Sequence, residues 1–158
     1  MRALRWLATW VVLAVSAETA YATHLVGGEL TYTCVGNNQY QVNLRVYRDC
    51  SVTTQLGNSV SIAVYNAAGT LVSQSNVSKS PTVAVSTATG NPCLTTPPNI
   101  CTEYADYTTT FSLPPISGGY TLVHQRCCRN NTISNITQPG SRGNTYFAQI
   151  PSNDVACN

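Results

Sequence analysis

The stretch QYQVNLRVYR, residues 39–48, alternates apolar and polar side chains with a period of two. One face carries the apolar side chains of Tyr40, Val42, Leu44 and Val46. The other face carries the polar side chains of Gln41, Asn43 and Arg45. Because successive side chains of a strand point to opposite sides, this pattern predicts a β-strand that packs one side on a core and leaves the other in solvent.

Seven further stretches repeat this pattern, at residues 28–35, 59–66, 70–77, 82–87, 105–113, 119–129 and 145–151. Glycine, asparagine and proline, the usual turn residues, separate them. After residue 22 no stretch shows an apolar stripe of helical period. About eight short strands of this kind predict an all-β fold, an immunoglobulin-like antiparallel β-sandwich, with a small barrel as the alternative.

The first 22 residues have the layout of a secretory signal peptide. Arg2 and Arg5 precede an apolar run at 7–17, and Ala20 and Ala22 form a small-x-small cleavage motif. No later segment approaches the roughly 20 apolar residues of a spanning helix. We therefore expect residues 1–22 to be removed and 23–158 to form a single domain, secreted or at the cell surface, with no membrane insertion after cleavage.

The composition argues against electrostatic partners. Charged residues make up 9% of the chain, against roughly 25% in typical soluble domains. The net charge of +2 is too small to predict binding to nucleic acid or to an anionic membrane. The basic residues are almost all arginine, with Lys79 as the only lysine, and arginine favours bidentate contacts.

Seven cysteines follow the signal peptide, and exported cysteines are usually paired. We expect six half-cystines: Cys34, Cys50, Cys93, Cys101, Cys127 and Cys128. A Cys93–Cys101 bridge would close a proline-rich loop. Adjacent strand residues face opposite ways, so Cys127 and Cys128 are expected to bond to different elements, with Cys34 and Cys50 as the preferred partners among several open connectivities. Since seven is odd, Cys157 is left unpaired or in an external disulfide.

The stretch HQRCCR, residues 124–129, raises the question of reactive chemistry. His124 and Cys127 would fall on opposite faces of a strand, which disfavours a catalytic pair. Adjacent cysteines also lack the spacing of a zinc site. Glu103 and Asp106 do not face one substrate, and no phosphate-binding loop or hydrolase motif occurs. We therefore predict a protein that is not an enzyme and holds no metal or cofactor.

Four arginines form the candidate binding site. If Cys50 bonds to Cys127 or Cys128, the segments 45–50 and 126–129 lie together. Asp49 would then be surrounded by Arg45, Arg48, Arg126 and Arg129. Such a cluster predicts either a structural arginine–carboxylate network or a pocket for an anion or carboxylate of a partner.

Three blocks of the chain invite comparison with a known family: ATHLVGGELTYTCVGNNQYQVNLRVYRDC (22–50), PPNICTEYADYTTTFSLPPISGGYTLVHQRCCRNNTISNI (97–136) and NDVACN (153–158). They resemble the N-terminal region of large exported surface proteins of Bacteroidetes, which carry PKD-type repeats and a gliding-motility-associated sorting domain for type IX secretion. The resemblance implies an extracellular β domain of adhesin-like proteins. Such relatives continue past the last block, so the chain is either the N-terminal domain of a longer protein or a stand-alone version, and in the former case Cys157 would find its partner in the missing part.

The functional prediction is a non-enzymatic extracellular module for adhesion or for matrix and surface assembly, with an unknown extracellular protein or glycan as partner. One alternative is a structural spacer or a subunit that polymerises through an edge strand or Cys157. Another is a carbohydrate-binding module of a secreted hydrolase. Tyr104 and Tyr107, expected to be exposed but on opposite faces of a strand, support that last alternative only weakly.

Overall fold

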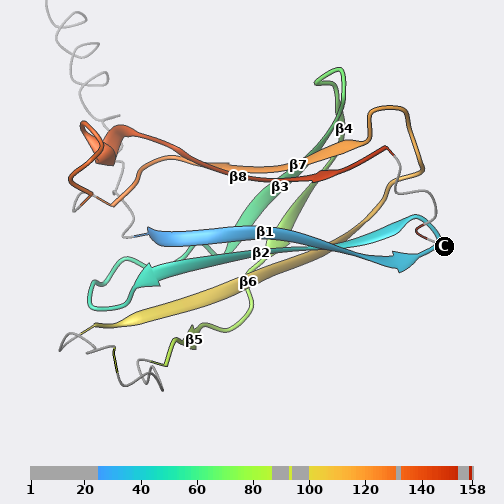
Figure 1. The fold of residues 1–158 in the computed structure, drawn as a ribbon. Coiled ribbons are helices and arrows are strands. Elements are labelled where there is room, and N and C mark those ends of the chain that lie inside the picture. Colours follow the sequence, from blue (N-terminus) through green and yellow to red (C-terminus); the bar gives the residue numbers. More distant parts are fainter. Residues whose placement is uncertain (1–24, 87–92, 94–99, 131–132, 153–156, 158) are drawn as a thin grey trace, which may run out of the picture.

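The computed structural model describes residues 25–86, 93, 100–130, 133–152 and 157, which form two packed antiparallel sheets (Figure 1). The strands in chain order are β1 (Leu25–Gly36), β2 (Gln39–Asp49), β3 (Ser59–Asn66), β4 (Leu71–Ser78), β5 (Val83–Ala84), β6 (Thr102–Ser112), β7 (Tyr120–Arg126) and β8 (Asn144–Ile150). A single 3₁₀ turn, η1 (Pro139–Ser141), completes the regular structure of the described residues. The predicted antiparallel β-sandwich is confirmed. In this part of the chain, no helix has the length and apolarity needed to cross a membrane.

The strand order is that of an immunoglobulin-like sandwich. The first sheet runs β1-β2-β6-β5 and the second runs β4-β3-β7-β8. With the strands lettered A, B, C, C′, D, E, F and G along the chain, these sheets become A-B-E-D and C′-C-F-G. That arrangement matches the immunoglobulin fold with one additional strand on its second sheet.

A tyrosine at the start of β7 reinforces this assignment. The buried Tyr120 donates its hydroxyl hydrogen bond to the carbonyl oxygen of Pro114 at 2.6 Å. Sandwiches of this class often carry such a tyrosine corner, in which the side chain fixes the connection that leads from one sheet to the other. The same connection requires Gly119, whose φ is +66° and where an added Cβ would lie 2.0 Å from the carbonyl oxygen of Ile150.

The core lies between the sheets and follows from the alternation of each strand. The first sheet contributes inward side chains that include Val42, Leu44, Ala105 and Tyr107, all fully buried. The second sheet contributes Ile62, Val64 and Leu122, also fully buried. Burying one such aliphatic side chain stabilises the fold by roughly 1.5–3 kcal/mol relative to exposure.

The two sheets approach closely along the side where β1 lies beside β8. A Cβ on Gly28 of β1 would meet the Tyr146 ring at 2.9 Å and the Arg45 carbonyl oxygen at 2.8 Å. The Tyr32 hydroxyl donates to the carbonyl oxygen of Gln149 at 3.0 Å across the same side. The absence of a side chain at Gly28 therefore lets a ring of the second sheet rest on the backbone of the first.

Two disulfides differ from the predicted pairing. Cys34 bonds to Cys157, and the Asn38 amide donates to the Cys157 carbonyl at 2.7 Å, so Cys157 lies against the β1–β2 turn. The expectation that Cys157 has no partner in this chain is wrong. Cys50 bonds to Cys101, because the β2–β6 register continues past its last pair and places these residues opposite each other. The expected Cys93–Cys101 bridge is therefore wrong as well, and Cys93 is exposed.

The third disulfide joins the adjacent Cys127 and Cys128. On an extended strand their side chains would diverge, but β7 ends at Arg126 and Cys128 takes a left-handed φ of 81°. The predicted bridges from these cysteines to Cys34 and Cys50 are wrong for this reason. Three disulfides fit a chain that folds in an oxidising compartment.

Candidate functional site

The four candidate arginines do not form one cluster. Arg45 and Arg48 lie on opposite faces of β2, Arg126 ends β7, and Arg129 follows the vicinal disulfide. The predicted arrangement around Asp49 is wrong, since Cys50 bonds to Cys101 and not to the 127–128 pair. The Asp49 carboxylate accepts a hydrogen bond from the Ser51 amide at 2.9 Å instead.

Arg48 has a structural role. Its side chain points inward and the residue is 5% exposed. Its Nε donates to Glu103 Oε1 at 2.5 Å, and its Nη1 donates to the carbonyl oxygens of Val52 and Thr54 at 3.1 and 2.5 Å. The two carbonyl oxygens belong to the segment that follows β2. Arg48 therefore holds this loop in place and is not available to a ligand.

Arg126 has a different environment. It continues the inward series of β7 that begins with Tyr120, yet it is only half-buried because it reaches the open end of the sandwich. Its Nη1 lies 4.0 Å from the position that a Cβ on Gly57 would take. The two ion pairs of the described residues, Arg45–Asp106 and Arg48–Glu103, do not include it. A half-buried guanidinium without a carboxylate partner can attract and bind an anion.

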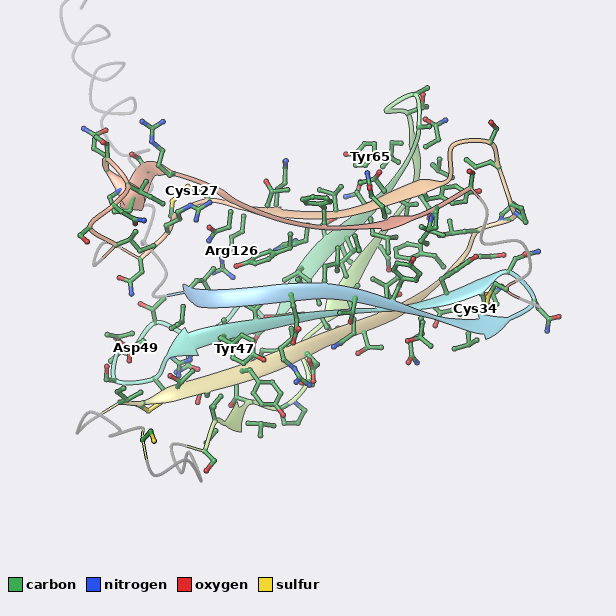
Figure 2. All side chains as sticks on the ribbon, viewed as in Figure 1. Cys34, Tyr47, Asp49, Tyr65, Arg126 and Cys127 are labelled. Carbon is green, nitrogen blue, oxygen red and sulfur yellow. A yellow bond between two sulfur atoms is a disulfide. The ribbon has the colours of Figure 1, made fainter. Side chains whose placement is uncertain are left out.

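Arg126 lines a pocket of about 420 Å³ at this end of the molecule. The other lining residues are Gln125, Cys127, Gly143, Asn144 and Thr145. Asn144 lies opposite Arg126 in the β7–β8 register and offers an amide donor on the same face, and no carboxylate is among the lining residues. Figure 2 shows Arg126 and Cys127 at one end of the sandwich and Cys34 at the opposite end.

Residues 143–145, which follow η1 and begin β8, form one wall of the pocket. The Cys128 amide donates to the Arg142 carbonyl at 3.1 Å, and Arg129 Nε donates to the Gly143 carbonyl at 3.0 Å. These bonds hold residues 142–144 against the vicinal disulfide. Arg129 therefore supports the wall with its Nε and lines a second, smaller hollow together with Tyr146.

His124 and Tyr146 pack behind the pocket with their rings stacked, at a centroid distance of 6.2 Å. His124 Nδ1 lies 2.8 Å from the Ser61 carbonyl oxygen, where it acts as donor, and its buried Nε2 has no partner in the described part of the chain. Burial, aided by the charge of Arg126, lowers the pKa of His124. Burial raises the pKa of Tyr146, opposed by the charges of Arg129 and Arg126. Both rings are therefore uncharged at neutral pH, and the positive charge of this end belongs to the arginines.

The reactive chemistry considered for HQRCCR finds no support in this geometry. Cys127 and Cys128 are joined in a disulfide, so neither presents a thiolate. His124 uses one ring nitrogen on a backbone carbonyl. Over the described ranges, no group of three or more histidine, cysteine, aspartate or glutamate side chains is placed to hold a metal ion.

Arg45 belongs to a second polar surface, the outer face of the first sheet. It makes a bidentate pair with Asp106, with Nε–Oδ1 and Nη2–Oδ2 distances of 2.8 and 2.9 Å, and its guanidinium carbon lies 4.1 Å from the centre of the Tyr104 ring. The bond from Arg45 lowers the pKa of Asp106, which is therefore ionised at neutral pH. Tyr47 and Tyr104 face each other across β2 and β6, with ring centres 5.7 Å apart.

This surface was not identified from the sequence. The alternation in 39–48 does place Asn43, Arg45 and Tyr47 on one face, but their partners on β6 depend on strand register. The expected pair of exposed tyrosines is corrected: Tyr104 is on the outer face, whereas Tyr107 is fully buried and donates its hydroxyl to the Gly57 carbonyl at 2.6 Å.

Similarity to known proteins does not assign a role to either surface. Comparisons with protein-family models, with curated proteins and with solved structures gave no match. The function proposed below therefore rests on the geometry of the described residues.

Proposed function

We propose that this chain is a non-enzymatic extracellular binding module that acts in adhesion or surface assembly by holding an oxyanion of a partner in the Arg126 pocket. The observation that carries the proposal is a half-buried arginine in a pocket of about 420 Å³ that no carboxylate lines. Among the four candidate arginines, Arg45 and Arg48 are already paired with carboxylates. The pocket thus offers a cation whose partner must come from outside the described residues.

The chemistry of the pocket favours a carboxylate, with sulfate or phosphate as the other oxyanion sources. A guanidinium presents parallel N–H groups that match two oxygens of one carboxylate. Asn144, opposite Arg126 in the β7–β8 register, lies on the same face and supplies an amide donor. A half-buried position raises the strength of such a pair above that of an exposed one, because water screens it less.

The same geometry weighs against a polymerising subunit linked through Cys157. That residue is 3% exposed and bonds to Cys34 of the same chain. Because Cys157 is already in a disulfide within the chain, it has no thiol that could form a bond to a second molecule. The predicted export signal and the resemblance to surface proteins support a location outside the cell.

The test is a titration of the chain without residues 1–22, followed by ¹H–¹⁵N NMR, with sodium acetate and with sodium sulfate. We expect shifts of the amides around the pocket, and at least a tenfold weaker response in Arg126→Gln. The two salts distinguish a carboxylate site from a sulfate or phosphate site.

Arg142→Gln is the matched control. Arg142 is exposed, its Nε donates to the Thr137 carbonyl at 3.4 Å, and it does not line the pocket. It should respond to acetate as the unaltered chain does. If a folded Arg126→Gln chain binds both anions as well as Arg142→Gln does, the pocket is not the binding site.

A further inference from the structure

The outer face of the first sheet has properties of a second binding surface, distinct from the Arg126 pocket. Antiparallel register sets its side chains in rows across the strands. One row is Tyr47, Tyr104 and Val83, from β2, β6 and β5 in that order. The next row holds Glu29, Arg45 and Asp106, and the one after it holds Thr31, Asn43 and Thr108. A row of rings and an aliphatic side chain therefore borders two rows of polar side chains.

The polar rows are organised before any ligand arrives. Asp106 Oδ1 accepts from Arg45 Nε and from Asn43 Nδ2 at 2.8 and 3.0 Å. Thr108 donates to Asn43 Oδ1 at 2.8 Å. A linked set of this kind fixes each side chain in one rotamer, so a ligand that binds here does not bear the entropic cost of ordering them.

Donor groups nevertheless remain for a ligand. Asp106 accepts hydrogen bonds from two N–H groups of Arg45, and the guanidinium has further N–H groups that can donate to a ligand. The side chains of Arg45 and Asp106 stay 32% and 27% exposed. The Tyr104 hydroxyl lies on the same face, and within the described ranges no hydrogen bond from it is found.

The charge of the face selects the kind of ligand. Arg45 and Asp106 neutralise each other, and the exposed Glu29 opposite Arg45 accepts from the Tyr47 hydroxyl at 3.4 Å. The face therefore carries a surplus carboxylate and does not attract an anion as the Arg126 pocket does. Its remaining polar members, including Thr31 and Asn43, form hydrogen bonds without carrying charge. A ligand that complements both parts of the face needs hydroxyl groups for the polar rows and apolar C–H surface for the tyrosine rings.

We propose that this face binds an uncharged glycan chain, with Tyr47 and Tyr104 packing against the C–H faces of the sugar rings. Arg45, Asn43 and Thr108 hydrogen-bond to the sugar hydroxyls. Pyranose rings combine these two surfaces, and consecutive sugars can follow the rows of the sheet. A protein partner would call for a broader apolar centre than the three residues of the Tyr47 row provide.

Affinity electrophoresis of the chain without residues 1–22, in gels that contain a soluble neutral polysaccharide, tests the proposal. A mixed-linkage β-glucan, a mannan and a soluble cellulose ether are the probes. At least one of them should retard the chain, and Tyr104→Ala should weaken this binding at least tenfold. Tyr104→Phe should keep most of it, since the ring remains.

Tyr65→Ala is the matched control, since Tyr65 is a half-exposed tyrosine on β3 of the second sheet (Figure 2). It should be retarded like the unaltered chain. The proposal is overturned if none of the three polysaccharides retards the chain, or if folded Tyr104→Ala and Tyr65→Ala migrate alike. Arg126→Gln should leave retardation unchanged, so the glycan face and the oxyanion pocket succeed or fail independently.

Discussion

His124 makes the stability of the protein depend on pH. Its pKa is lowered by burial and by the charge of Arg126, so the folded state binds fewer protons than the unfolded state near the unperturbed pKa of about 6.5. Stability is therefore full above that pH and falls as the pH drops through it. We expect the urea midpoint of unfolding to be lower at pH 5 than at pH 7.5.

His124→Asn isolates this contribution. Asparagine keeps an amide donor for the Ser61 carbonyl but does not titrate, and His24 is present in both chains. The difference in urea midpoint between pH 7.5 and pH 5 should shrink in the variant. An equal difference in both chains would mean that His124 is not the group that titrates in this window.

The arginines show what residue patterns can and cannot predict. Alternation correctly places Arg45 on the polar face of its strand, whereas Arg48, expected beside it around Asp49, lies on the inner face. It does not reveal that Glu103 and Asp106 of β6 lie opposite these arginines, because register between strands distant in sequence is set by the packed sheets. The predicted cluster was wrong since it depended on a disulfide pairing that the register rules out.

At the scale of the element, the packing of β1 against β8 depends on Gly28. Gly28→Ala would place a methyl group 2.8 Å from the Arg45 carbonyl oxygen and 2.9 Å from the Tyr146 ring. Backbone on one side leaves little room for relief, so we expect a loss of about 1–3 kcal/mol in the free energy of unfolding. Urea denaturation measures it.

Gly27→Ala is the control from the neighbouring position, where no atom lies within 4 Å of an added Cβ. Alanine also reduces the entropy of the unfolded chain, so this variant should be neutral or slightly stabilising. A Gly28→Ala chain as stable as Gly27→Ala would mean that β1 can move away from Tyr146 without cost.

The strands were predicted well where a half-buried alternation governs them and less well at their ends. The stretch 119–129 was expected to be one strand, but β7 stops at Arg126 because the vicinal disulfide turns the chain. The stretch 82–87 shrinks to Val83–Ala84, an edge strand with a partner on one side only. The period of the apolar residues predicts neither the geometry of a turn nor the position of a strand at the edge of its sheet.

At the scale of the whole molecule, the disulfides close loops of very different size. Cys34–Cys157 spans 123 residues, Cys50–Cys101 spans 51 and Cys127–Cys128 spans 1. A bond stabilises chiefly by restricting the unfolded chain, and the restriction grows slowly with loop length. The longest loop joins β1 to Cys157, which follows β8 in the chain, and so it secures the sandwich as a unit, whereas the shortest shapes one wall of the Arg126 pocket.

We therefore expect the paired change Cys34→Ser with Cys157→Ser to lower the free energy of unfolding by roughly 4–5 kcal/mol, and the matching change at Cys50 and Cys101 by about 4 kcal/mol. The pair Cys127→Ser with Cys128→Ser should cost far less stability yet weaken acetate binding, because it loosens the pocket wall. Urea denaturation ranks the three, and non-reducing peptide mapping verifies the bonds. Alkylation of Cys157 in the native protein would contradict the Cys34–Cys157 bond, and with it the closure of the sandwich at that end.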